Sequence, residues 1–318
     1  MSKLIDAIID EARESTENET FDDEVGLSEE EVVKFVNQAV NRLHSKIVAQ
    51  HPHIFQAEKT FNIVGGQESY AIPSHKAYLS NKVSAVEFSS TSSTDDLYPL
   101  YPTVLRNRDT GAEGDPSRYI RRSGSIYLVP TPIASNGLLR LTYTPKAKQL
   151  DKRRGLIKAV TTSGSGITNL EVNYVNGSTV DLAQLTKRTR ITVVDKYGNI
   201  KMENVLIEGA TSSSSYDATI TVDSSFTFED GETISVDDYI ISGAYSTTHL
   251  PDELGPEVER YIQAYVEYKI LARDSSVDSQ EMFQVLGEIE ADIIASYADV
   301  SDDTMEIPEI NNDQEDWF

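Results

Sequence analysis

Residues 28–50 read SEEEVVKFVNQAVNRLHSKIVAQ, and this stretch decides how the N-terminal part of the chain folds. Its apolar side chains recur every three or four residues, which is typical of an amphipathic helix. Ser28 and Glu31 form a capping box, because the Ser28 hydroxyl can accept from the Glu31 amide while the Glu31 carboxylate reaches back. Pro52 ends the pattern, so we expect the helix to stop near Gln50. The stripe consists of Val32, Phe35, Val36, Ala39, Val40, Leu43 and Ile47.

A shorter helix is predicted upstream, since residues 4–12 carry apolar side chains at the same spacing. An acidic polar loop separates it from the long helix, over about residues 15–26. The start of the chain has no basic segment followed by an uninterrupted apolar run, so we expect no signal peptide. No stretch approaches the ~18 apolar residues of a membrane span. We therefore expect a protein that uses no membrane and is either made and kept in the cytoplasm or assembled there into something larger.

Downstream of the long helix the hydrophobic period changes to that of strands. Residues 55–64 predict a strand, Gly65-Gly66 a tight turn, and residues 68–72 the hairpin partner of that strand. The segment from 95 to 115 contains Pro and Gly breaks and predicts a loop. Together these segments predict a small antiparallel β unit. Its other expected strands are 82–89, 118–122, 125–129 and 138–143.

From about residue 152 to 246 the composition shifts to Thr, Ser, Val, Ile and Gly. Short strands broken by turns at this spacing predict a compact sandwich or barrel. The stretch has the character of a self-contained insertion, whose ends are expected to lie close together. The expected strands are 156–161, 168–172, 190–194, 200–207, 218–222 and 233–239.

After Pro251 the helical period returns. One helix is expected around Val258, Ile262 and Val266, and a second around Leu286 and Ile293, with a break at 274–279 that favours an antiparallel helix pair. Neither helical end of the chain can bury its stripe alone, so we expect both to pack together around the first β unit. The chain length fits about two domains, at roughly 150 residues each.

The fold class predicted is α+β: a helical body made of N-terminal helices and a C-terminal helix pair, a small antiparallel β unit, and an inserted all-β sandwich or barrel-like domain. The expected divisions are 1–151 (core, N-terminal part), 152–248 (inserted β domain), 249–300 (core, C-terminal helices) and 301–318 (an extended acidic arm). The last twenty residues contain eight acids and no bases, so we expect them to be extended when the subunit is alone.

The formal charge of −24 is unevenly distributed. Residues 1–50 hold 12 acids and 5 bases, residues 106–158 hold 12 bases and 4 acids, and residues 202–318 hold 28 acids and 3 bases. A basic middle of one copy can face the acidic end of a neighbour, or the segments can neutralise each other within one subunit or face water. The sequence leaves both open. The candidate inter-subunit basic patch consists of Arg121, Arg122, Lys152, Arg153 and Arg154.

Composition and motifs argue against an enzyme. Cys is absent, which excludes disulfides and thiolate metal sites, and five His leave little material for a metal or acid–base centre. No phosphate-binding loop, nucleophile elbow or zinc-protease motif occurs. The acidic total also excludes the commonest nucleic-acid binder, whose affinity comes from a basic surface. We expect no catalytic residue, no metal and no cofactor.

Several short phrases follow one another in a recognisable order. Asn37-Gln38-Ala39 lies in the long helix, and the closing helices end the series over 251–298. Over residues 28–150, this order resembles the head-to-tail adaptor (connector, head-completion) proteins of tailed bacteriophages. Residues 152–248 fall outside the resemblance. The phrases between these ends are Tyr70-Ala71-Ile72-Pro73, Pro116-Ser117-Arg118-Tyr119, Ser125-Ile126-Tyr127-Leu128-Val129-Pro130-Thr131-Pro132 and Leu141-Thr142-Tyr143.

The resemblance implies a structural protein of the virion neck, at the head–tail junction, assembled in the host cytoplasm. Its partners would be other copies of itself in a ring of about twelve, the portal protein, and a tail or nozzle protein, with tail fibres as a further candidate. Double-stranded DNA would pass through without specific binding, because carboxylates repel phosphates within the ~8 Å over which charge acts at physiological salt.

The resemblance also implies that the arm over 301–318 docks onto the portal. Its candidate anchors are Ile307, Ile310, Trp317 and Phe318, since buried aromatic side chains dominate interface energies. The alternative is an unstructured, solubilising acidic tail. An alternative function is a fibre-attachment, receptor-binding or decoration protein that acts through the inserted β domain. A hydrolase that uses paired carboxylates is a third hypothesis, which the sequence disfavours.

Overall fold

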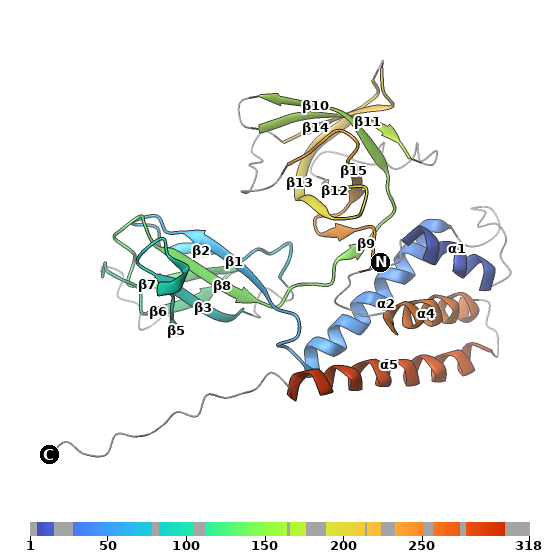
Figure 1. Ribbon diagram of the computed structural model, residues 1–318, viewed down its shortest axis with the longest axis horizontal. Helices are drawn as coiled ribbons and strands as arrows, with labels where there is room; N and C mark the ends of the chain where they lie inside the picture. Colours follow the sequence, from blue (N-terminus) through green and yellow to red (C-terminus); the bar gives the residue numbers. More distant parts are fainter. Residues whose placement is uncertain are drawn as a thin grey trace.

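The computed structural model describes residues 5–15, 28–77, 83–104, 112–163, 166–175, 189–213, 215–223, 233–250, 257–273 and 278–302. Over these residues the chain is α+β, with four helices and many antiparallel strands, as predicted. Figure 1 shows a helical body, a sheet unit beside it and a barrel above it. The helices are α1 (Ile5–Ser15), α2 (Glu29–Gln50), α4 (Glu257–Arg273) and α5 (Asp278–Asp302).

The predicted capping box is present at the start of α2. The Glu31 amide donates to Ser28 Oγ, and the Ser28 amide donates to the Glu31 carboxylate, each over 3.3 Å. Three acids in the first turn of α2 also suit the positive end of the helix dipole. The helix ends at Gln50, where the Pro52 signal predicted its end.

One hydrophobic cluster unites the four helices. Val36 and Leu43 of α2 are fully buried in it together with Ile5 of α1 and Tyr261 of α4, and Leu286 of α5 joins them. α4 and α5 run side by side as the expected antiparallel pair (Figure 1). The two ends of the chain therefore pack together, as predicted. Among the described members of this cluster, however, none belongs to β1–β8, so the expectation that the helices surround the first β unit is wrong.

The first β unit has its own cluster between two four-stranded sheets, of orders β1-β8-β3-β4 and β2-β7-β6-β5. The predicted hairpin of 55–64 with 68–72 is wrong: β1 pairs with β8, and β2 pairs with β7. The expected strands at 118–122, 125–129 and 138–143 are confirmed. The bounds are β1 Ala57–Asn62, β2 Ser69–Ala71, β3 Val83–Ser89, β4 Tyr98–Pro99, β5 Tyr101–Pro102, β6 Arg118–Arg122, β7 Ser125–Val129 and β8 Leu138–Tyr143.

The inserted stretch forms a closed barrel of order β10-β11-β14-β13-β12-β15, which is one of the two predicted alternatives. Its interior cluster draws only on strands and turns of the barrel among the described residues. The last expected strand, at 233–239, is displaced, because Asp237 takes a positive φ of 71° in a turn and the strand starts at Tyr239. The bounds are β10 Gly155–Ser163, β11 Gly166–Tyr174, β12 Arg190–Val194, β13 Ile200–Thr211, β14 Ala218–Val222 and β15 Tyr239–Ser242.

The barrel joins the rest of the chain through two short strands that the sequence analysis did not predict. β9 (Gln149–Leu150) leads into the barrel, β16 (Ser246–Thr247) leads out, and they pair in parallel. The Asp151 amide also donates to Thr247 O over 3.0 Å. Both connections to the barrel are thus hydrogen-bonded to each other directly beside the helices.

Candidate functional site

Asn37 of α2 holds the incoming linker against the helical body. Its Nδ2 donates to Leu150 O over 2.8 Å, and its Oδ1 accepts from Leu150 N over 2.7 Å. A single side chain therefore satisfies both backbone groups of the last residue of β9. Asn37 belongs to one of the sequence phrases singled out above, and the structure gives it this specific role.

Arg154 lies where α2, the incoming linker and the end of the barrel meet. Its Nε and Nη2 donate to the two oxygens of Asp151 over 2.7 and 2.6 Å, and Nη1 and Nη2 reach Glu30 over 3.1 Å each. Asp151 accepts in addition from the Ser242 amide over 2.7 Å. Arg154, only 9% exposed, thus connects the first turn of α2 to the linker that enters the barrel and, through Asp151, to the last residue of β15.

The protonation states of this junction follow from burial and from the paired charges. Burial opposes ionisation of Glu30, but the hydrogen bond and charge of Arg154 hold the pKa of Glu30 below its ordinary value. Burial raises the pKa of Asp151, and the hydrogen bonds from Arg154 counter that effect. Despite its own burial, Arg154 has a raised pKa because it is hydrogen-bonded to Asp151 and Glu30, so it remains charged.

A second charged contact joins the first β unit to the barrel. Glu203 of β13 is 9% exposed and forms an ion pair with Lys76, and His75 Nε2 lies 3.6 Å from the same carboxylate oxygen. The Lys146 amide donates to Lys76 O, which holds this loop against the end of the β unit. The barrel is therefore connected to the helices through Arg154 and to the sheets through Glu203.

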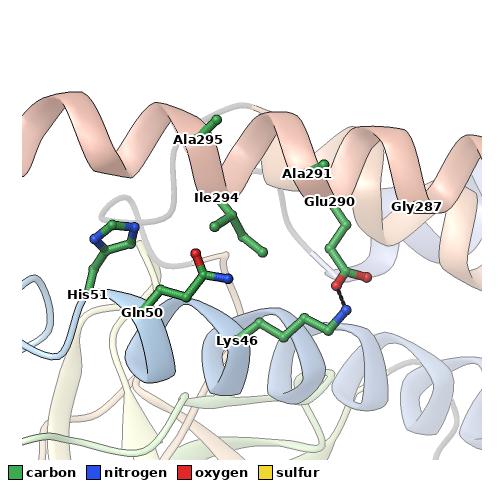
Figure 2. A pocket seen from close by; sticks show the side chains of 8 residues that line it. All are labelled: Lys46, Gln50, His51, Gly287, Glu290, Ala291, Ile294 and Ala295. Atoms are coloured by element: carbon green, nitrogen blue, oxygen red, sulfur yellow. Dashed lines mark ion pairs between the residues drawn. The ribbon is translucent and has the colours of Figure 1, made fainter.

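A groove of about 470 Å³ runs between α2 and α5 (Figure 2). Glu290 of α5, only 3% exposed, forms ion pairs with Lys46 and with Arg42, whose Nη2 lies 3.0 Å from the carboxylate. Figure 2 shows the Lys46 ammonium aimed at this carboxylate across the groove. The lining residues are Lys46, Gln50, His51, Gly287, Glu290, Ala291, Ile294 and Ala295.

The structure separates the predicted basic patch into two groups. Arg121 and Arg122 are exposed on β6 of the first β unit, whereas Lys152, Arg153 and Arg154 follow β9 at the barrel junction. Lys152 lies 3.2 Å from both Glu29 and Glu30. Together with Arg154, it pairs with acids of its own chain. For these two residues the contacts favour neutralisation within one subunit, which the sequence left as an alternative.

Arg153 makes different contacts from its two neighbours. Its guanidinium lies 4.5 Å from the Tyr239 ring centroid and donates to Lys196 O over 2.7 Å.

The predicted arm anchors Ile307, Ile310, Trp317 and Phe318 lie outside the described residues.

Sequence reasoning missed Glu203 and Glu290, the two buried acids that hold neighbouring elements together. Glu290 had a readable signal, because it lies four residues after Leu286, at a buried position of the helical stripe. An acid at such a position needs a cation, and Arg42 and Lys46 supply it. Glu203 had no comparable local signal, since its partner Lys76 precedes it by more than a hundred residues.

Within the part of the chain that the structure describes, no group of three or more His, Cys, Asp or Glu side chains could hold a metal ion. None of the described helices is long and apolar enough to cross a bilayer. The contacts between elements described above consist of ion pairs and hydrogen bonds.

Residues 2–153 match the model of a protein family described as SU10 adaptor protein. No curated protein sequence matches the chain. The matched range covers α1, α2, the first β unit and β9, and it stops two residues before the first strand of the barrel. The resemblance drawn from the order of sequence phrases is thus confirmed as that of a phage adaptor family.

Proposed function

Over residues 2–153 the chain belongs to the SU10 adaptor protein family, a family of structural phage adaptors, and on this premise we propose its place in the virion. About twelve copies form a ring beneath the portal, join the head to the tail and continue the DNA channel. The protein acts without catalysis and without a cofactor. It resides in the virion neck after assembly in the host cytoplasm.

The observation that best supports this proposal is the junction at Arg154. A neck component has to transmit force between head and tail without its parts rotating against one another. Here the helices, the sheets and the barrel are connected by the pairs of Arg154 with Glu30 and of Lys76 with Glu203, in which Arg154 and Glu203 are buried. Buried charges left without partners are costly, so these contacts favour one relative orientation of the three parts.

In this proposal residues 1–151 and 249–300 form the adaptor core, 152–248 form the inserted domain, and 301–318 form an arm that docks on the portal. Trp317 and Phe318 supply the aromatic anchors of that arm. Arg121 and Arg122, exposed on β6, are the basic residues best placed to meet an acidic surface of a neighbouring copy.

The negative charge of the chain suits the passage of DNA. With a formal charge of −24 per copy, carboxylates along the channel wall repel phosphates over about 8 Å at physiological salt. The duplex then slides past the wall without adhering to it.

The direct test is to incubate the purified protein with portal-bearing capsids of the same virus and to image the vertices. We expect a closed ring on the portal vertex. A protein that never joins the vertex contradicts the proposal. Capsids that lack the portal are the control, since attachment to them would show that the portal is not the partner.

The arm is tested with a chain that ends at Val300. We expect its attachment to capsids to fall at least tenfold, because the apolar anchors are lost. A full-length chain with Asp313→Asn and Glu315→Gln keeps these anchors and serves as the control. If the truncated chain attaches as well as the full-length chain, the arm is not the docking element.

A second candidate role belongs to the barrel alone. The family match ends at residue 153, and the barrel that follows has its own hydrophobic cluster. We propose that it is an attachment point for a fibre or decoration protein, added to the adaptor core. Virions whose protein lacks 155–242 would then assemble necks but lose the attached component, whereas loss of the necks themselves would contradict this role.

A further inference from the structure

The groove between α2 and α5 has an open, mostly apolar wall on α5. Gly287, Ala291 and Ala295 are exposed along it, and a Cβ added at Gly287 would meet nothing within 4 Å. Ile294, which is partly buried, lies on the same wall (Figure 2). The wall therefore has space for an apolar side chain from another segment.

Among the described residues, the opposite side of the groove presents two cations to one carboxylate. The single carboxylate of Glu290 faces two cations, Arg42 and Lys46. Burial and the charge of Arg42 both lower the pKa of Lys46. An occupant that combines apolar side chains with carboxylates would complement both the wall and this surplus cation.

A segment of that chemistry follows α5 directly, outside the described residues. Residues 303–318 hold six acids and no bases, and the acids alternate with apolar residues, as in Glu306-Ile307 and Glu309-Ile310. The segment also starts beside the groove, because α5 ends at Asp302. Asp302 lies seven positions after Ala295, a distance of about 10 Å along the helix.

We propose that, before the subunit meets a partner, residues 303–318 of the same chain fold back into the α2–α5 groove. A turn of about four residues reverses the chain after Asp302, and each extended residue then covers about 3.3 Å. Ile310 thereby returns to the level of Ile294. Glu309 and Asp313 are close enough to compensate the charge of Lys46.

This inference goes beyond the proposed function, because it concerns the free subunit. In the free subunit the groove binds residues 303–318, the segment that is expected to dock on the portal in the assembled neck. The two proposals fail independently: attachment to a portal does not require the groove, and occupation of the groove does not require a portal.

The absence of Cys from the chain allows a direct test in the full-length protein. Asn311→Cys is combined with Ala291→Cys, whose side chain lines the groove. The control pair is Asn311→Cys with Asp292→Cys, a position that is also exposed and lies one residue further along α5 but does not line the groove. After mild oxidation of dilute protein, the intramolecular disulfide is quantified by intact mass and peptide mapping.

We expect the 291–311 disulfide to form at least tenfold faster than the 292–311 disulfide. Equal rates would show that the segment samples the surface without preference and would overturn the proposal. A product that is mainly a covalent dimer would also overturn it, because the occupant would then be the segment of a second copy. Absence of any disulfide in the 291–311 protein has the same consequence.

Two further variants connect the result to the groove itself. Gly287→Leu fills the space on the wall and should slow the 291–311 disulfide several-fold, whereas Gly287→Ala should leave its rate unchanged. Lys46→Gln removes the surplus cation and should slow the reaction, whereas Lys34→Gln, at an exposed position of the same helix, should not. If the filled and unfilled grooves react alike, the segment lies elsewhere.

Discussion

The helical body and the barrel are built from the chain in opposite ways. The helical cluster combines α1 and α2 with α4 and α5, which are separated by about two hundred residues of sequence. The barrel closes within residues 155–242, and its described cluster contains no helical residue. The helices therefore depend on the junction that brings the chain ends together, while the barrel depends on its own strands. Four substitutions or pairs of substitutions test this difference.

The largest effect is expected at the junction between the two parts. Arg154→Met removes the partner of Asp151, a buried carboxylate, and should lower the free energy of unfolding of the helical body by about 4 kcal/mol. Urea unfolding gives this value, and hydrogen exchange locates the loss at α2 and β9. The double variant with Asp151→Leu should recover part of it, because no buried charge is left unpaired. A loss below about 1 kcal/mol in the single variant would contradict the role of the junction.

A cavity made in the hydrophobic cluster of the helices or of the barrel should destabilise only the part of the molecule that contains it. Leu43 in α2 and Ile220 in β14 are both fully buried, so Leu43→Ala and Ile220→Ala should each cost about 3 kcal/mol. Hydrogen exchange should accelerate only in the helices for Leu43→Ala and only in the barrel for Ile220→Ala. If either variant accelerates exchange equally in both parts, the two clusters unfold as one unit, and the comparison is wrong.

A buried histidine should make the helical body sensitive to pH. Burial lowers the pKa of His44 from 6.5 to about 4, and its ring stacks on Phe55 at 5.0 Å. Because protonation is easier in the unfolded chain, the contribution of His44 to stability is complete above pH 6.5 and is lost as the pH falls toward 4. The expected loss between pH 7 and pH 5 is about 2 kcal/mol.

The control for this prediction is His44→Leu, which keeps an apolar side chain in the cluster and removes the titration. Urea unfolding at pH 7 and pH 5 should give a smaller difference for the variant than for the natural chain, by about 2 kcal/mol. Barrel amides should exchange alike in both proteins at either pH. Identical pH dependence of the two proteins would show that His44 does not cause it.

Local signals in the sequence predicted the helices and many of the strands. The capping box of Ser28 and Glu31 and the stripe of α2 involve neighbours within one or two turns, so they are readable without the fold. The bounds of β8 and β12 were likewise predicted to the residue from short apolar runs between turn signals. The family was also recognisable from the sequence, because the phrases that carry the resemblance are short and follow one another over residues 28–150.

The pairing of strands was not readable, because it depends on distant residues. Gly65-Gly66 indicated a hairpin, yet a Cβ at Gly65 would lie 2.3 Å from Ile133 O, so this turn packs against a distant loop. The contacts that join the barrel to the helices could not be predicted for the same reason. Asn37 meets Leu150 across 113 positions, and β9 has too few residues to show any period. A side chain whose partner lies that far along the chain carries no local pattern.

The smallest expected effect comes from two glycines with equal space around them. A Cβ added at Gly287 in α5 or at Gly209 in β13 meets nothing within 4 Å, and neither glycine has a positive φ. Gly287→Ala should stabilise the helical body by up to about 1 kcal/mol, because alanine is the best helix former and glycine one of the worst. Gly209→Ala should stabilise the barrel by less than half of that, because alanine is a poor strand former and Gly209 follows a register shift. Urea unfolding, with exchange read separately in α5 and β13, measures both gains. Equal gains would mean that both glycines act only through the unfolded chain, whereas a larger gain in α5 shows that local helical propensity still adds to a body whose core is assembled from the two ends of the chain.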